Sequence, residues 1–455
     1  MQCSKVVDLS GDMKPVVKQA LEKRNTARTN ENAGSTASDV EGSVDLDNYV
    51  QILCLELTEP GEKNVKQAID VLQKREDVLF AEPDYVGHLC AVYPNDPYIS
   101  DQWGISDVKL NDAWGIHTGV NSVKVGVLDS GIDGTHPELS DKIIVSMSRD
   151  YVTETGNTAV SAVTDDNGHG THVAGIIAAQ GYNGVGISGV AWNISIVSLK
   201  IANLFGTINV SHVISAINYA NSSEIKILNF SGKIVENSEA FKMAIQQYTG
   251  LLICAAGNDG TNNDAGGSYP SSWDLPNVLS VGALENSVTK ASYSNYGHTT
   301  VDIFAPGSNI LSCYTCSAFA CSLDSSHYAD GYHYVSGTSM AAPFVTGVAA
   351  LIKSQYYSYT GAHIKERILI GAEDVGPLTG LCSTGGKLNA YRALHDHTYT
   401  IRKYNSTYHI NACDCGVIGY QEEHTYTTVG TARVCTKCSY SPDIQIQSHE
   451  NVEPW

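Results

Sequence analysis

The chain has 455 residues, so it is long enough for two or three domains with a large core. Its 28 basic and 48 acidic residues give a net charge of −20, which disfavours nucleic acid and anionic membranes as partners. No run of about 18 apolar residues occurs, so we expect no membrane span. Residues 1–5 lack the apolar core of a secretory signal. We therefore expect a protein that stays inside the cell, leaves by another route, or carries its signal upstream of this sequence.

The N-terminal part of the sequence changes character near residue 44. Residues 1–44 are polar and predict a leader and linker. Residues 45–90 predict a small α+β unit with a strand at 49–57, an amphipathic helix at 65–74 and a second strand at 78–81. So small a unit is marginal alone, and we expect it to need a neighbour.

From residue 91 to about 395, apolar strands alternate with helices rich in small residues. This alternation predicts an α/β fold, a parallel central sheet with helices on both faces. The expected strands are 123–128, 194–201, 225–230 and 251–256, and the expected helices are 170–179, 210–220 and 238–248. Functional groups in such sheets collect where the strands end.

Ser339 lies at the start of one such helix, in Gly337-Thr338-Ser339-Met340-Ala341-Ala342-Pro343. Free N–H groups and the helix dipole favour a developing negative charge at that position. A lone serine before an Ala-rich helix is more often a helix cap than a nucleophile. A catalytic role therefore requires partners elsewhere in the chain.

Two other motifs supply candidate partners for Ser339. Asp129 ends the strand at 123–128, where a buried carboxylate is costly unless a cation or hydrogen-bond donor faces it. His169 stands between two glycines at a helix start. Either residue alone is equally well explained as a capping Asp or a loop His. Together, the three residues favour nucleophilic catalysis, in which Ser339 attacks a carbonyl, His169 moves the proton and Asp129 orients His169.

Three motifs of this sequence resemble the three signatures of the subtilisin-like serine proteases, and the resemblance covers roughly residues 91–395. The motifs are Asp129-Ser130-Gly131, His169-Gly170-Thr171-His172 and the Ser339 motif. The resemblance implies a subtilisin-like catalytic domain and serine endopeptidase activity, and the order Asp, His, Ser is that family's own. It also implies that Asn258 donates to the oxyanion beside the backbone N–H of Ser339. Two alternatives are a non-catalytic binding protein on a protease fold, which the four intact groups disfavour, and a protein whose main role lies C-terminal to residue 395.

The resemblance also extends to the substrate side. Ser231 and Gly232 resemble the edge that pairs with an extended substrate. Asp259 and Ser268 match positions in the wall of the primary specificity pocket, which implies medium to large side chains and some tolerance for basic ones. Gly232-Lys233 departs from the family's Leu-Gly-Gly pattern, so the shape of the adjoining pocket is left open.

A calcium site is also implied by resemblance. Residues 183–191 resemble the family's calcium loop, with Asn183 supplying a side-chain oxygen and the backbone supplying carbonyls. Glu138, where many relatives have Asp, and Asp96 would be its carboxylate ligands. The alternative is a Gly-rich turn with solvated acids nearby.

The twelve cysteines are too few for a disulfide scaffold. Cys254 lies in an apolar run and is expected to be an inert core thiol. An insertion expected before the Ser339 motif carries Cys313, Cys316 and Cys321. These cysteines suit either disulfides or a metal site that His327, His333 or Cys382 would complete.

Residues 396–455 predict an accessory module. His397-Thr398-Tyr399-Thr400 recurs at residues 424–427, and each copy precedes a cysteine pair. The two pairs, Cys413 with Cys415 and Cys435 with Cys438, suit zinc, while disulfides or free thiols are equally good interpretations.

Residues 45–90 resemble the family's inhibitory propeptide, chiefly through the segment 77–85. The resemblance implies a self-processing zymogen, and we place the cut after Cys90. It further implies secretion, with polypeptide substrates and the protein's own propeptide as partners. We expect a monomer.

Overall fold

The computed structural model describes residues 3–8, 53–57, 62–75, 78, 81–82, 91–153, 159–315, 331–397, 399–403, 408–413, 417–429 and 432–437. By the contacts of its backbone, the chain divides into two units, Met1–His88 and Leu89–Trp455.

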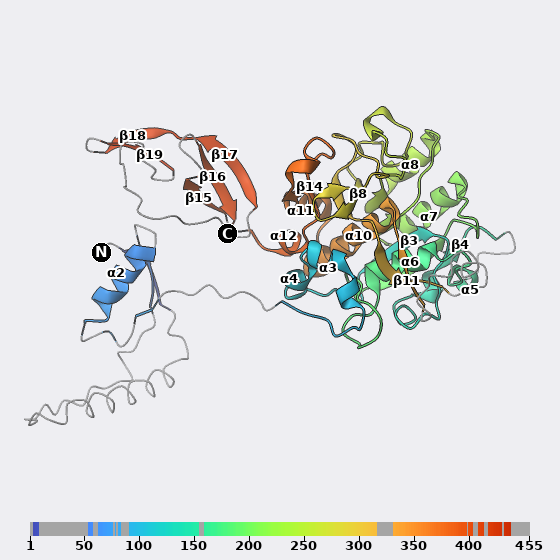
Figure 1. Ribbon diagram of the computed structural model, residues 1–455, viewed down its shortest axis with the longest axis horizontal. Coiled ribbons are helices and arrows are strands. Elements are labelled where there is room, and N and C mark those ends of the chain that lie inside the picture. Colours follow the sequence, from blue (N-terminus) through green and yellow to red (C-terminus); the bar gives the residue numbers. More distant parts are fainter. Residues whose placement is uncertain are drawn as a thin grey trace, which may run out of the picture. The chain divides into compact units, whose positions relative to one another are not determined.

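The described residues of the N-terminal unit form two antiparallel strands and one helix. Strand β1 (Cys3–Asp8) pairs with β2 (Leu53–Leu57), and α2 (Glu62–Leu72) follows (Figure 1). The sequence prediction placed residues 1–44 outside this unit, whereas the pairing of β1 with β2 brings the first residues into it. Polarity alone could not reveal that pairing, because a two-stranded edge needs few apolar side chains. Leu79, Phe80 and Cys90, on which the second strand and the proposed cut depend, lie outside the described residues.

The second unit is built on a ten-stranded sheet, and the predicted α/β fold is confirmed. Its strand order is β13-β14-β10-β8-β7-β6-β3-β5-β4, with β9 paired to β8. All pairings along this order are parallel except that of β13 with β14. The strands are β3 (Lys124–Asp129), β4 (Arg149–Asp150), β5 (Ser195–Lys200), β6 (Ile227–Phe230), β7 (Leu251–Ala255), β8 (Val278–Asn286), β9 (Thr289–Lys290), β10 (Ile303–Pro306), β13 (Glu373–Asp374) and β14 (Gly386–Lys387).

Helices cover both faces of this sheet, each over its own hydrophobic core (Figure 1). One core contains side chains of α6 (His169–Ala178), α10 (Thr338–Gln355) and α11 (Gly361–Ile370). The other contains side chains of α7 (Val210–Ser222) and α8 (Glu239–Gln247). The middle strands are buried on both faces, which explains why they read as continuous apolar runs.

Shorter elements complete the second unit. Strands β11 (Ile310–Cys313) and β12 (Tyr332–Val335) form an antiparallel pair within the expected insertion. The short helices are η1 (Ile99–Asp101), α3 (Trp103–Asp107), α4 (Leu110–Trp114), η2 (Val145–Met147), α5 (Ala159–Ala162), η3 (Asn263–Ala265), η4 (Gly376–Leu378) and α12 (Ala390–Leu394).

The C-terminal residues form two small antiparallel sheets. One contains β15 (Tyr399–Lys403), β16 (Tyr408–Cys413) and β17 (Ile418–Glu423), and the other contains β18 (Tyr426–Val429) and β19 (Ala432–Cys435). The two repeats seen in the sequence thus lead into β15 and β18. Across the whole described part of the chain, no helix is both long and apolar enough to cross a membrane.

Candidate active site

Asp129 and His169 are brought together at the carboxyl end of the sheet. Asp129 is the last residue of β3, and His169 is the first residue of α6. The Nδ1 atom of His169 lies 2.7 Å from Oδ1 of Asp129. The Asp129 side chain is 6 % exposed and that of His169 is 32 % exposed. The carboxylate is thus buried behind an imidazole whose other nitrogen, Nε2, remains available for proton transfer.

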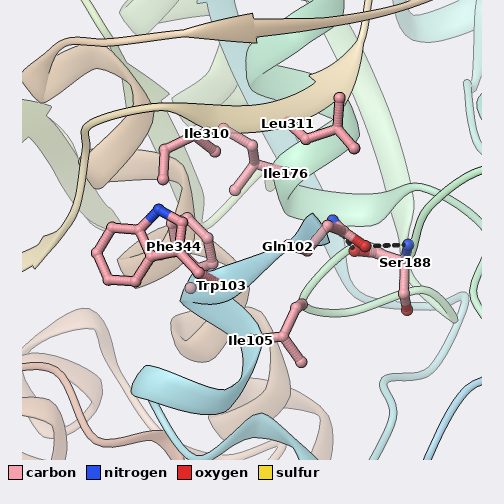
Figure 2. A pocket seen from close by; sticks show the side chains of 9 residues that line it. Gln102, Trp103, Ile105, Ile176, Ser188, Ile310, Leu311 and Phe344 are labelled. Atoms are coloured by element: carbon pink, nitrogen blue, oxygen red, sulfur yellow. Dashed lines mark hydrogen bonds between the residues drawn. The ribbon is translucent and has the colours of Figure 1, made fainter. Parts of the chain in front are cut away.

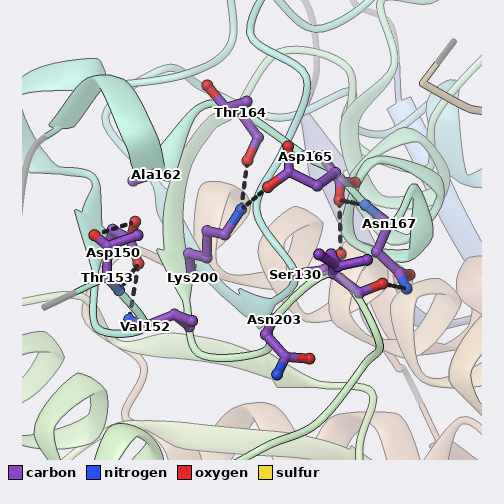
Figure 3. A network of polar contacts seen from close by, with 12 residues as sticks. Ser130, Asp150, Val152, Thr153, Ala162, Thr164, Asp165, Asn167, Lys200 and Asn203 are labelled. Atoms are coloured by element: carbon purple, nitrogen blue, oxygen red, sulfur yellow. Dashed lines mark hydrogen bonds and ion pairs between the residues drawn. The ribbon is translucent and has the colours of Figure 1, made fainter. Parts of the chain in front are cut away.

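A second carboxylate, Asp165, holds the start of α6 in place (Figure 3). Its side chain is buried and accepts five hydrogen bonds. The donors are Ser130 Oγ, the backbone N–H groups of Asn167, Gly168 and Thr171, and Thr171 Oγ1, at 2.6–3.1 Å. Negative charge at a helix N-terminus is favourable, because unpaired N–H groups and the helix dipole face it.

A buried lysine fixes the loop that carries Asp165 (Figure 3). Lys200, the last residue of β5, donates from Nζ to the Thr164 carbonyl at 2.9 Å and pairs with Asp166 at 3.2 Å. These two contacts hold the residues on either side of Asp165. The position of His169 therefore depends on β3, β5 and this loop together.

The two histidines of α6 have opposite protonation tendencies. Burial by itself lowers the pKa of His169, but the charge and hydrogen bond of Asp129, with the charge of Asp165, outweigh burial, so its pKa is raised. Burial, followed by repulsion from His169, lowers the pKa of His172 to about 3. The neutral His172 ring lies 3.0 Å, through Nε2, from the carbonyls of both Ile310 and His333. His172 is thus a structural link to β11 and β12.

Ser339 occupies the first turn of α10, and Pro343 shapes its surroundings. Proline has no amide hydrogen, so Pro343 cannot donate to the Ser339 carbonyl four residues earlier. Ser231 Oγ donates to that carbonyl instead, at 2.8 Å. The Ser339 hydroxyl in turn donates to the Ser231 carbonyl at 3.0 Å. The end of β6 therefore holds both the backbone and the side chain of Ser339.

Asn258 lies beside the same helix N-terminus, just after β7. Its Oδ1 accepts from the N–H of Thr338 at 2.9 Å and from Thr338 Oγ1 at 2.8 Å. These bonds leave the amide nitrogen free to donate. A Cβ atom built on Gly337 would lie 3.3 Å from Asn258 Nδ2 and 3.6 Å from the Ser339 nitrogen. Two N–H donors, Asn258 Nδ2 and the Ser339 nitrogen, thus lie within 3.6 Å of one point beside a residue that has no side chain.

The predicted substrate residues lie around this centre. Ser231 and Gly232 follow β6, and a Cβ atom on Gly232 would meet Ile208 at 2.8 Å. Asp259 follows Asn258, and its N–H is held by Asn295 Oδ1 at 2.9 Å. Ser268 is buried, and its hydroxyl donates to the Ala256 carbonyl at 2.8 Å. The hydroxyl of Ser268 is therefore engaged within the protein.

The three predicted calcium ligands also meet. Asp96 accepts from the N–H groups of Tyr182 and Asn183, and Asn183 Nδ2 donates to Glu138. Glu138 further accepts from the Ile187 N–H and the Tyr332 hydroxyl. Burial first, together with the nearby Asp96 charge, raises the pKa of Glu138 to about 7 despite these bonds.

A hard cation fits the chemistry of this donor set. Asp96 and Glu138 are buried, and among the described residues no lysine, arginine or histidine pairs with either. No group of three or more His, Cys, Asp and Glu side chains suited to a metal occurs in that same part of the chain. Calcium would therefore rely on two carboxylates and on neutral oxygens.

The predicted cysteine sites are only partly covered. Cys313 and Cys382 are buried and belong to different hydrophobic cores. Cys413 and Cys435 are buried in the C-terminal sheets. Cys254 is a buried thiol in the core, as predicted. The cysteines that lie outside the described residues are Cys90, Cys316, Cys321, Cys415 and Cys438.

A small, mostly apolar cavity lies apart from these groups (Figure 2). Trp103, Ile105 and Phe344 line it, and Gln102 closes one side through two hydrogen bonds to the backbone of Ser188. The four candidate catalytic residues do not line it. It is a packing gap beside α10.

Sequence analysis missed Asp165, Thr338 and the pairing of Lys233 with Asp259. A polar run before a helix is a recognisable start signal, and Asp165 belongs to one. The sequence gives no sign of which acid in that run turns inward, because the choice depends on Ser130 and Thr171 across the loop.

Comparisons with known proteins agree with this geometry. The sequence pattern of the Subtilase family matches residues 120–390. A thermophilic serine proteinase of Bacillus sp. (strain AK1) is 33% identical over 335 residues, which cover 73% of this chain and 76% of that protein. Thermitase of Thermoactinomyces vulgaris is 34% identical over 306 residues, which cover 66% of this chain and 99% of that protein. A solved protease structure from Pseudoalteromonas arctica PAMC 21717 matches with a TM-score of 0.57 and 28% identity, covering 67% of this chain and 99% of that one.

Proposed function

The chain belongs to the Subtilase family and is a subtilisin-like serine endopeptidase, and we propose that Asp129, His169, Ser339 and Asn258 carry its reaction. The contact of His169 Nδ1 with Asp129 Oδ1 at the carboxyl end of the sheet is the observation that carries this assignment. With Nδ1–H donated to the carboxylate, the Nε2 lone pair of neutral His169 is the base.

The first step transfers a proton from the Ser339 hydroxyl to His169 Nε2 as Oγ attacks the peptide carbonyl. The hydroxyl now donates to the Ser231 carbonyl, so rotation about the Cα–Cβ bond of Ser339 must redirect it. The tetrahedral oxyanion accepts hydrogen bonds from Asn258 Nδ2 and the Ser339 N–H. His169 then gives its proton to the leaving amine, and water hydrolyses the acyl-enzyme by the same route.

A serine-directed phosphonate tests the assignment of the nucleophile. We expect the reagent to label Ser339 and to abolish cleavage of casein, because it occupies the position of the acyl group. Asp129→Asn should slow labelling, since it removes the carboxylate that orients His169. Labelling that persists in Ser339→Ala would show that another residue is the nucleophile.

We also propose that Asp96, Glu138 and Asn183 hold a structural calcium ion. Asp96 and Glu138 are buried and pair with no lysine, arginine or histidine of the described residues, which supports this proposal because calcium would supply charge compensation there. The Asn183 amide, which now donates to Glu138, would have to turn its oxygen toward the ion.

The test of this calcium site is calorimetry of the protein with calcium or with chelator. Binding to the native state alone, at about 100 times the Kd, adds about 2.7 kcal/mol of stability. A Glu138→Gln variant should lose most of that gain.

We also propose that residues 45–90 are a propeptide that the enzyme removes from itself by a cut after Cys90, and that the protein is secreted, as its resemblance to the family implies. The Ser339→Ala protein should remain one chain, whereas the wild type should give two fragments. A cut at the same place in Ser339→Ala, made in a protease-deficient host, would assign processing to another enzyme.

Zinc at the C-terminal cysteines stays a prediction, which metal analysis of the purified protein tests.

A further inference from the structure

Opposite charges meet beside the residues of the proposed reaction centre. Lys233 Nζ forms an ion pair with Asp259 Oδ2. Lys233 lies two residues after Ser231, whose carbonyl accepts from the nucleophile, and Asp259 is the neighbour of Asn258. Because consecutive Cα atoms are about 3.8 Å apart, both charged residues start within about 8 Å of groups that face the reacting carbonyl.

Three backbone segments meet at this ion pair. Ile234 and Tyr269 exchange two backbone hydrogen bonds of 2.9 Å, which tie the segment after β6 to the segment that contains Ser268. Ser268 Oγ donates to the Ala256 carbonyl at 2.8 Å, which ties that segment to the end of β7. The Lys233–Asp259 pair joins the first segment to the last. The three segments thus form a closed ring beside the reaction centre.

From this ring we infer that Lys233 is a specificity-determining residue: it neutralises Asp259 and so disfavours peptides with a cationic side chain on the residue whose carbonyl is attacked. The inference rests on the proposed roles of Ser339 and Asn258. The side chain of that substrate residue is carried by the Cα atom bonded to the attacked carbonyl carbon. We therefore expect it to lie close to the ring. Without Lys233, the Asp259 carboxylate would attract Lys and Arg side chains there. This differs from the tolerance for basic side chains expected from the sequence.

The ion pair is suited to this role because it is anchored on one side and weak. The Asp259 backbone is fixed by Asn295, so the carboxylate cannot move far from Lys233. The side chains of Lys233 and Asp259 are 35% and 48% exposed. A pair so exposed changes relative binding by up to about fivefold. It therefore tunes the choice between substrates rather than forming a rigid barrier.

The test compares kcat/KM for peptides that differ only at the residue before the cleaved bond. In Lys233→Met, we expect the ratio of the Lys peptide to the Met peptide to rise about fivefold, because Asp259 becomes unpaired. In Asp259→Asn, we expect the ratio of the Glu peptide to the Gln peptide to rise by a similar factor. The double variant should return both ratios to the wild-type values. In about 1 M salt, where the Debye length is about 3 Å, the changes should shrink.

Lys226→Met is the matched control. Lys226 precedes β6 at its other end and pairs with Glu224 at 2.7 Å, with an exposed fraction of 33%, close to that of Lys233. This variant should leave both ratios unchanged. Ratios that do not change in Lys233→Met and Asp259→Asn would overturn the inference. Any one ratio that shifts in the same direction in both variants would also overturn it, since removal of opposite charges should shift that ratio in opposite directions and a like shift would indicate a steric effect. Cleavage of the Met peptide by Ser339→Ala would instead contradict the proposed nucleophile.

Discussion

The starts of α6 and α10 are built alike but differ in charge. Each helix presents its functional side chain, His169 or Ser339, in the first turn, and each has an acceptor group across its N-terminus. At α6 the acceptor is the Asp165 carboxylate. At α10 it is the neutral amide of Asn258. The carboxyl end of the sheet thus places a carboxylate at the helix start that carries the base and a neutral amide at the helix start that carries the nucleophile.

The reaction explains this difference. His169 becomes a cation when it takes the serine proton, so a nearby carboxylate stabilises the charged form. The substrate carbonyl becomes an anion beside Ser339, so a carboxylate there would repel it. An asparagine meets both needs at α10, because its oxygen caps Thr338 while its nitrogen remains a donor.

Changing the acceptor at α10 into a carboxylate should have the largest effect. We expect Asn258→Asp to retain the bonds to Thr338 but to lose the N–H donor and to add a repelling charge. The loss in kcat should be about 10³-fold, the upper end of the range established for loss of the oxyanion donor in a subtilisin, from which this number is taken. KM for a peptide and the melting temperature should change little. A variant that retains wild-type kcat would exclude Asn258 from oxyanion binding.

Filling the space between the two donors tests the same site without changing any charge. A methyl group in Gly337→Ala would lie 3.3 Å from Asn258 Nδ2, where the oxyanion is expected. The backbone at Gly337 is extended, so alanine can adopt it. We expect kcat to fall by about 10²-fold, since the carbonyl can no longer approach both donors.

Gly376→Ala is the matched control, because a Cβ atom there meets no heavy atom within 4 Å. It should leave kcat and the melting temperature unchanged. If Gly337→Ala kept full activity, the oxyanion could not lie at the point between Asn258 and Ser339.

Removing the negative charge at α6 should have a smaller effect, seen best in the pH profile. The Asp165 charge helps to raise the pKa of His169, so Asp165→Asn should lower it. Activity needs neutral His169 and rises as pH increases through that pKa. The acid limb of kcat/KM should therefore move to lower pH. Stability should fall by about 1–3 kcal/mol, because a buried N–H of α6 loses its acceptor.

Asp166→Asn provides the control for Asp165. Asp166 is the next residue, but its side chain is 55% exposed and pairs with Lys200. We expect a much smaller shift of the acid limb from it. Equal shifts in the two variants would mean that the general charge of the loop, and not the position of Asp165, sets the pKa of His169.

Sequence reasoning was accurate for the elements and incomplete for their supports. Strand β6 was expected at 225–230 and occupies Ile227–Phe230, because an apolar run between polar turns is a local signal. Asp129, His169 and Ser339 were found because their motifs are short and specific. The acceptor at α6 was not found, since five donors from separate positions choose Asp165 and the sequence does not show them meeting. Likewise, Lys233 was recognised as a departure from the family pattern, but its partner became evident only from the structure.

The smallest expected effect concerns the carbonyl of Ser339, and it tests why α10 needs help from β6. Pro343 cannot donate to this carbonyl, and Ser231 Oγ does so instead. Ser231→Ala should therefore cost about 1–2 kcal/mol, since a partly buried carbonyl loses its donor. Pro343→Ala restores an N–H four residues after Ser339, so the same Ser231→Ala change should cost less in that background. A double-mutant cycle by urea denaturation should give a coupling of about 1 kcal/mol. Additive effects would mean that the proline does not make the Ser339 carbonyl dependent on Ser231.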